Sequence, residues 1–158
     1  MAYAGSLYVM GGTANEDFDI AQVAVMVRPA LEAYAAIPVG SLDFIIGGTT
    51  LAIEAYAYAH RTSLNYPAMI TMGLHGASFL VELAGGASLF SADSEGRFAI
   101  IDEEIALPSP RVEVRAGYRF KDVLDVRGIL GTERRLIAGE DVSRTYLAVA
   151  FGTGGTVR

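Results

Sequence analysis

The sequence contains no cysteine, one lysine (Lys121) and two histidines (His60 and His75) among its 158 residues. Without thiols, disulfide scaffolds, zinc fingers, iron–sulfur clusters and thiol nucleophiles are excluded. Basic residues are also few: 12 Lys and Arg stand against 18 Asp and Glu, for a formal net charge of −6. A protein that reads nucleic-acid sequence must neutralise phosphates, so we expect no sequence-specific nucleic-acid partner.

Long apolar runs are missing as well. No uninterrupted run reaches the ~20 residues that a membrane-spanning helix needs. The most apolar part, residues 42–87, is broken by charged residues and by many glycines. Residues 1–5 lack the positive cluster and apolar block of a signal peptide. We therefore expect a soluble protein with no membrane contact, located in the cytoplasm or, after assembly, in a virion.

Apolar residues are nevertheless abundant: 52% of the chain is hydrophobic and only 19% is charged. This balance excludes a disordered chain, which would need fewer apolar residues and more charge. A chain of 158 residues can bury one sizeable core but not comfortably two. We therefore predict a single domain over residues 1–158.

Two stretches alternate strictly between polar and apolar residues, and this period of two is typical of a half-buried strand. The polar positions of residues 51–60 are Glu54, Tyr56, Tyr58 and His60. In residues 111–120 the polar positions are Arg111, Glu113, Arg115 and Arg119. We predict that the apolar side of each strand packs in the core and that the polar side faces water or a partner.

Shorter apolar segments follow one another along the rest of the chain, with glycines between them. We interpret Gly47–Gly48 and Gly85–Gly86 as turns, and likewise Gly128 and Gly131. Short strands at this spacing predict a mainly β fold, a sandwich or barrel of short antiparallel strands.

One segment favours a helix in the N-terminal half. Asp19 could cap it, and apolar residues recur at helical spacing from Ile20 to Ile37. Pro29 should kink or split such a helix. The alternative is a strand over residues 18–27 followed by a short helix with Pro29 in its first turn. The pattern does not decide between these two, and an α+β fold is the alternative to the mainly β prediction.

The row Glu54, Tyr56, Tyr58 and His60 is the best candidate for chemistry. In the lumen of a small β-barrel enzyme or ligand-binding protein, these residues could line a cavity, with Glu54, Tyr58 and His60 as catalytic groups. Alternatively, Tyr56 and Tyr58 cover a neighbouring subunit, and we favour this interpretation. We find no phosphate loop, no serine nucleophile elbow and no histidine spacing typical of zinc, so no cofactor or metal is predicted.

The arginine face of residues 111–119 has two interpretations. Its side chains could pair with acidic clusters of an adjacent copy, or they could keep an exposed edge strand from unwanted pairing. We predict a structural, non-enzymatic subunit of a symmetric homo-oligomer that binds copies of itself and other assembly subunits. A phage virion component is the favoured form: a tail-tube or head-tail ring subunit, or a capsid decoration protein. The predicted interface residues are Tyr56, Tyr58, Arg111, Arg115 and Arg119.

Overall fold

The computed structural model describes residues 2–14, 24–58, 61–93, 98–99, 105–106, 109–120, 124–137 and 140–156. Throughout these segments the chain forms antiparallel strands of one sheet, and the described part contains no helix. The mainly β prediction is confirmed. The described strands form one sheet rather than the two packed sheets of a sandwich.

Eight of the strands are long, with 11 to 17 residues each: β1 (Ala2–Ala14), β2 (Ala24–Val39), β3 (Leu42–Ala52), β5 (Arg61–His75), β6 (Phe79–Asp93), β9 (Ser109–Phe120), β10 (Leu124–Ile137) and β11 (Glu140–Thr156). The short β4 (Glu54–Tyr58) follows β3 after Ile53 and pairs with the same two neighbours, β2 and β5. Two-residue strands, β7 (Phe98–Ala99) and β8 (Ile105–Ala106), pair with β6 and β10.

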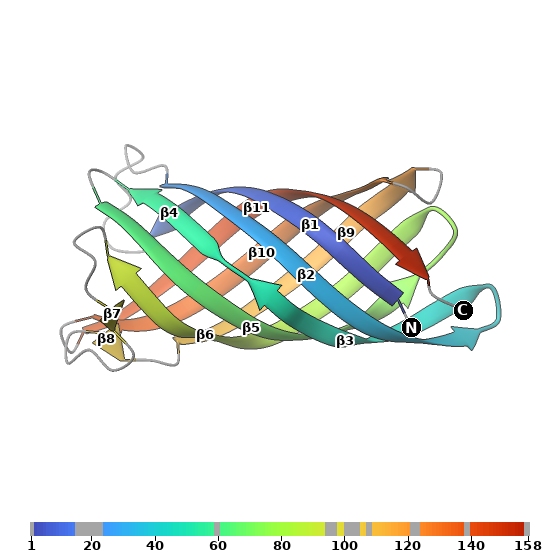
Figure 1. The fold of residues 1–158 in the computed structure, drawn as a ribbon, viewed down its shortest axis with the longest axis horizontal. Coiled ribbons are helices and arrows are strands. Elements are labelled where there is room, and N and C mark those ends of the chain that lie inside the picture. Colours follow the sequence, from blue (N-terminus) through green and yellow to red (C-terminus); the bar gives the residue numbers. More distant parts are fainter. Residues whose placement is uncertain are drawn as a thin grey trace.

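Each long strand pairs with two neighbours. The pairings run from β1 through β2, β3, β5, β6, β9, β10 and β11, and β11 pairs with β1 again. Figure 1 shows these strands running diagonally, with nearer strands crossing more distant ones. The sheet therefore has an enclosed face and an outer face.

The register of the pairings defines the tilt of the strands. Stepping through paired residues leads from Tyr3 to Ala33, Gly48, Ile70, Gly85, Val112, Thr132, Thr145 and then Thr13. The path thus returns to β1 at Thr13 rather than at Tyr3, which is a large stagger along the strand. With a rise of about 3.4 Å per residue and a strand spacing of about 4.8 Å, this stagger tilts the strands by about 40°. Eight strands at this tilt enclose a space that side chains alone can fill.

The two ends of the sheet differ in their connections. Gly40 and Ser41 join β2 to β3, and residues 76–78 join β5 to β6. Gly40 has a φ of 64°, a left-handed conformation that glycine adopts without strain. These turns lie near the ends of β1 and β11 where the two termini are marked in Figure 1. We call this the short-turn end.

The predicted helix is wrong for the described residues 24–37, which belong to β2; residues 20–23 lie outside the described segments. The apolar positions of this segment also satisfy a period of two, because Leu31, Ala33, Ala35 and Ile37 alternate with more deeply buried side chains. Pro29 lies within the strand at an irregularity: β3 is interrupted at Ile53, whose N–H donates to the Pro29 carbonyl over 3.2 Å. An irregular site of this kind tolerates the missing donor of proline.

The predicted turns at glycine pairs are also wrong. β3 continues through Gly47–Gly48, β6 through Gly85–Gly86, and β10 through both Gly128 and Gly131. Glycine inside a strand often marks close approach of another chain segment rather than a turn. The long strands are therefore longer than the short strands expected from the sequence.

Candidate functional site

The alternation of β9 is present as predicted, but its two sides are reversed. Arg111 and Arg115 are 1% exposed and Glu113 is 0% exposed, whereas Val112 and Val114 are 47% and 50% exposed. The charged side chains thus lie on the enclosed face and the apolar side chains on the outer face. Arg111 and Arg115 are thus buried within the single chain, and the interface role of Arg111, Arg115 and Arg119 stays a prediction.

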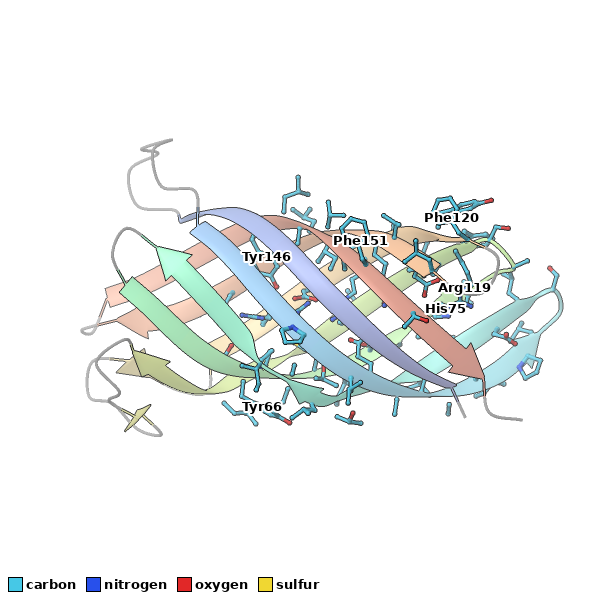
Figure 2. All side chains as sticks on the ribbon, turned by 45° about the horizontal axis from the view of Figure 1, so that its top comes forward. Tyr66, His75, Arg119, Phe120, Tyr146 and Phe151 are labelled. Carbon is cyan, nitrogen blue, oxygen red and sulfur yellow. The ribbon has the colours of Figure 1, made fainter. Side chains whose placement is uncertain are left out.

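The same reversal extends over the long strands whose side chains are described. Exposed large apolar side chains occur on all of the long strands whose side chains are described: Leu31, Ile37, Val39, Ile46, Leu51, Ile53, Ile70, Met72, Leu74, Phe79, Val81, Leu83, Leu89, Val112, Val114, Tyr118, Phe120, Leu124, Leu130, Leu147, Val149 and Phe151. Figure 2 shows such side chains along the outside of the ribbon, with Phe120 and Phe151 labelled. An apolar surface of this extent is far larger than a soluble monomer exposes.

The enclosed face holds a network of ion pairs centred on Glu113. Arg28 of β2 donates to both Glu113 carboxylate oxygens over 2.7 and 3.1 Å. Arg115 Nε donates to Glu113 Oε2 over 2.8 Å, and the Tyr146 hydroxyl donates to Oε1 over 2.5 Å. Buried charges are tolerated when they are paired and hydrogen-bonded in this way. The network joins three strands that are far apart in the sequence.

A four-charge cluster, formed by Glu32, Glu82, Arg115 and Arg127, lies beside Glu113. Arg115 Nη1 is 2.8 Å from Glu32 Oε1 and 3.6 Å from Glu82 Oε2. Arg127 Nη1 is 3.2 Å from Glu82 Oε2 and 3.6 Å from Glu32 Oε2. Each of the four residues comes from a different long strand and is at most 2% exposed. The cluster therefore ties the walls of the enclosed space together.

Towards the short-turn end the network continues to partly exposed groups. Asp125 accepts from Arg127 Nη2 over 3.2 Å and from Arg119 Nε over 2.8 Å. Glu82 also contacts His75 Nε2 over 2.8 Å. The side chains of Arg119 and His75 are 25% and 11% exposed, so the network reaches solvent at this end. Arg119 is thus on the same face as Arg115 but close to its rim.

Towards the opposite end the network continues through Arg111. Arg111 Nη2 is 3.1 Å from Glu133 Oε2, and Ser88 donates to Glu133 Oε1 over 2.9 Å. The Arg111 guanidinium lies 5.6 Å from the centre of the Tyr146 ring, a distance typical of a cation–π contact. Figure 2 labels Tyr146, which lies within the curve of the sheet. Small apolar residues, among them Ala148 and Ala150, belong to the same buried cluster as Tyr146.

For the predicted row Glu54, Tyr56, Tyr58 and His60, the structure tests the strand but not the roles of the side chains. Glu54, Tyr56 and Tyr58 lie on β4, which confirms the strand predicted there, and Tyr56 pairs in register with Met26. The structure describes the backbone of these three residues but not their side chains. His60 lies outside the described residues. The catalytic role of Glu54, Tyr58 and His60 and the interface role of Tyr56 and Tyr58 stay predictions.

Other kinds of site find little support in the described segments. They contain no group of three or more acidic or histidine residues that could hold a metal ion. A shallow hollow of about 450 Å³ lies between β2 and β3, lined by Ala33, Tyr34, Ala35, Ala36, Ile46 and Gly47. No charged residue lines this hollow, whereas substrate sites combine apolar walls with convergent polar groups.

Across the described ranges, the chain has no helix of the length and apolar character needed to cross a bilayer.

Comparison with known proteins identifies the fold. No protein-family model matches the sequence, and no curated protein matches it. Among solved structures, the chain is similar to the outer membrane enzyme PagL, with a TM-score of 0.56, 13% identity, and coverage of 94% of this chain and 98% of that one. It is also similar to Neisserial surface protein A (NspA), with a TM-score of 0.53, 10% identity, and coverage of 96% and 95%. At these identities the likeness shows the fold alone.

These neighbours correct the predicted function and location. PagL is an outer membrane enzyme and NspA is a surface protein, and the fold that the chain shares with them contradicts the prediction of a phage tail, ring or capsid subunit. The predictions of a soluble chain, of a cytoplasmic or virion location and of no membrane contact are contradicted on the same grounds. The predicted burial was reversed because it depends on which solvent surrounds the sheet. We assumed water around the sheet, and therefore placed the apolar side inside.

The sequence analysis missed most members of the network, including Arg28, Glu32, Glu82 and Arg127. Each is a charged residue whose two chain neighbours are uncharged, as in Phe79–Ala84, where Glu82 is the single charge. A lone charge in a strand of this kind is expensive to bury unless a partner faces it from another strand. The sequence therefore did contain a signal: isolated acidic residues in some strands and isolated basic residues in others, which are expected to pair.

Proposed function

We propose that the chain is a closed β-barrel that spans a membrane of the outer-membrane type, with lipid around its outer face and a polar, side-chain-filled lumen. The observation that carries this proposal is the reversal on β9 and its neighbours. Large apolar side chains are about half exposed, while arginines and carboxylates are buried. An apolar exterior and polar interior are what a bilayer selects in transmembrane β-barrels.

The height of the apolar surface supports this proposal. On β6 the exposed apolar side chains begin at Phe79 and extend to Leu89. At about 3.4 Å per residue and a tilt of about 40°, this row spans about 26 Å along the axis. The outward apolar band of transmembrane barrels is about 25 Å tall, so the two heights agree.

An aromatic collar, formed by Phe79, Tyr118 and Phe120, lies next to the short-turn end. Phe79 pairs in register with Tyr118, and the Tyr118 and Phe120 rings are 4.8 Å apart in an edge-to-face arrangement. Aromatic rings of this kind favour the headgroup level of a bilayer. Short turns face the periplasm in bacterial barrels, and we therefore assign the short-turn end to that side.

Ring closure also supports the prediction of one domain over residues 1–158. The first and last described strands, β1 and β11, pair along the whole of β1, from Ala2 to Ala14. All backbone groups of a membrane-spanning sheet need partners, and this pairing supplies them for the two strands nearest the termini.

The test is insertion. Chain refolded from urea into phosphatidylcholine vesicles should float with the lipid on a density gradient. On gel electrophoresis in dodecyl sulfate, the unheated sample should migrate differently from the heated one, because a folded barrel resists the detergent. Chain kept in urea is the control for both measurements. A chain that stays monodisperse in detergent-free buffer and does not float with vesicles would overturn the proposal.

A further inference from the structure

The ion pairs of the enclosed face form a nearly continuous polar path along its length. From Arg119 at the short-turn end, contacts run through Asp125 and Arg127 to the four-charge cluster. From there they run through Glu113, Tyr146 and Arg111 to Glu133 and Ser88. A path of charged groups can replace part of the hydration shell of a passing ion, which an apolar core cannot do.

The four-charge cluster has two available pairings. Arg115 lies 2.8 Å from Glu32 and 3.6 Å from Glu82. Arg127 has the opposite preference, since it lies 3.2 Å from Glu82 and 3.6 Å from Glu32. Each arginine thus lies within ion-pair distance of both glutamates at once, and Arg115 Nη2 also lies 2.8 Å from Glu113 Oε2. Closely matched alternatives of this kind are what a two-state element requires.

The wall beside the cluster, on β5, includes a glycine and a buried hydroxyl. Gly73 of β5 pairs in register with Glu82, and a side chain there would press against the Glu82 Cγ. Two residues along the same strand, Thr71 is fully buried, and its hydroxyl has no hydrogen-bond partner among the described residues. A buried hydroxyl in a polar site is suited to bind water. The wall beside the cluster is thus both small and polar.

We infer that the four-charge cluster is the gate of a path for small inorganic ions through the lumen. In the pairing described above, the arginines bridge the strands and block the path. When the pairs exchange or break, the path admits water and ions. This inference rests on the proposed function, because a path along the enclosed face carries ions only if that face crosses a membrane.

The test measures ion flux across planar bilayers in potassium chloride, with insertion scored separately by flotation and gel mobility. Arg115→Ala leaves Glu32, Glu82 and Glu113 with less positive charge to balance them, so flux should rise and favour potassium over chloride. The rise should be about tenfold or more, the change expected when at least one charge-assisted pair is lost. Glu82→Gln should also raise flux, with the preference shifted towards chloride.

Glu133→Gln is the matched control, since Glu133 is as buried as Glu82 and is also paired with an arginine but lies outside the cluster. Because Glu133 lies on the path but not in the gate, the flux of Glu133→Gln should stay well below that of Glu82→Gln. If Arg115→Ala does not insert, Arg115→Lys keeps the charge but cannot bridge several carboxylates, so it should raise flux with little ion preference.

Two results would overturn the gate and leave the membrane-spanning barrel intact: inserted variants of the cluster that conduct no better than the unaltered chain, or a Glu133→Gln variant that conducts as well as Glu82→Gln. Failure of the unaltered chain to insert would instead overturn the proposed function itself.

Discussion

Tyr146 and Gly131 illustrate how single residues determine the packing of the enclosed face. The two residues pair in register on β10 and β11, and the Tyr146 ring lies over the glycine. A methyl group at Gly131 would overlap that ring, so glycine is required for the ring to lie flat. This position lets the Tyr146 hydroxyl reach Glu113 and the ring face Arg111. The space that Gly131 leaves for the Tyr146 ring thus permits two contacts of the network.

At this scale we predict that Gly131→Ala destabilises the folded chain by about 1–3 kcal/mol, the usual cost of overpacking a filled interior. The measurement is urea unfolding in vesicles, followed by tyrosine fluorescence. Gly128→Ala is the control on the same strand, since a methyl group there would meet nothing closer than the Ala116 carbonyl oxygen at 3.8 Å. Equal losses for the two variants would mean that the Tyr146 ring does not need Gly131.

At the scale of one element, β9 shows why two positions on the same face of a strand respond differently to the same change. Val114 pairs with Leu83 on one side and with Leu130 on the other, and all three are about half exposed. Phe120, further along the strand, belongs to the aromatic collar. Both residues point outward, but they lie at different depths of the proposed bilayer.

We therefore predict that Val114→Arg destabilises the folded chain in vesicles by about 2–4 kcal/mol, whereas Phe120→Arg destabilises it by about 0–1 kcal/mol. The reason is depth: a cation near the middle of the hydrocarbon is desolvated, while one at the collar reaches headgroups and water. Urea titration of both variants in the same vesicles makes the comparison. A similar cost at both positions would argue that the outer face contacts protein or water rather than lipid.

The elements also show how much the sequence predicts. The alternation over residues 111–120 correctly predicts a strand, because period two is a property of the backbone. It cannot say which side is buried, since that depends on the surrounding solvent. The segment 20–37 favours a helix because its apolar positions fit both periods, and Gly47–Gly48 and Gly85–Gly86 favour turns because glycine in a strand resembles a turn in composition. Without the interpretation of these glycines as turns, the sequence would have predicted longer strands.

The candidate site was predictable only in part. The alternation correctly groups Arg111, Arg115 and Arg119 on one face, but their partners Glu32 and Asp125 lie on other strands. Pairs that are 83 residues apart, such as Arg115 and Glu32, depend on the whole arrangement of the sheet. No local pattern contains that information.

At the scale of the whole molecule, the ring of pairings makes every long strand depend on its two neighbours. β11 contacts both β10 and β1, so it supplies the hydrogen bonds of two strands. In lipid, an unpaired strand edge is costly because no water can replace the missing partner.

Removal of residues 140–158 should therefore prevent insertion altogether rather than weaken it. We expect the shortened chain to show no difference in gel mobility between heated and unheated samples, and not to float with vesicles. A chain ending at Thr156, which keeps all of β11, is the control and should insert normally. If the chain without β11 inserted like the control, the sheet would not depend on the β1–β11 pairing.

The span of the buried ion pairs along the chain has a consequence for assembly. Arg28 and Glu113 are separated by 85 residues, and Arg115 and Glu32 by 83. None of these charges can find its partner until β2 and β9 have come to face each other, so during most of the folding reaction they must remain hydrated. Dehydration of the interior and formation of the pairs are therefore expected to be simultaneous and late. A half-assembled chain would carry a wet, charged interior, and the finishing step would expel that water all at once.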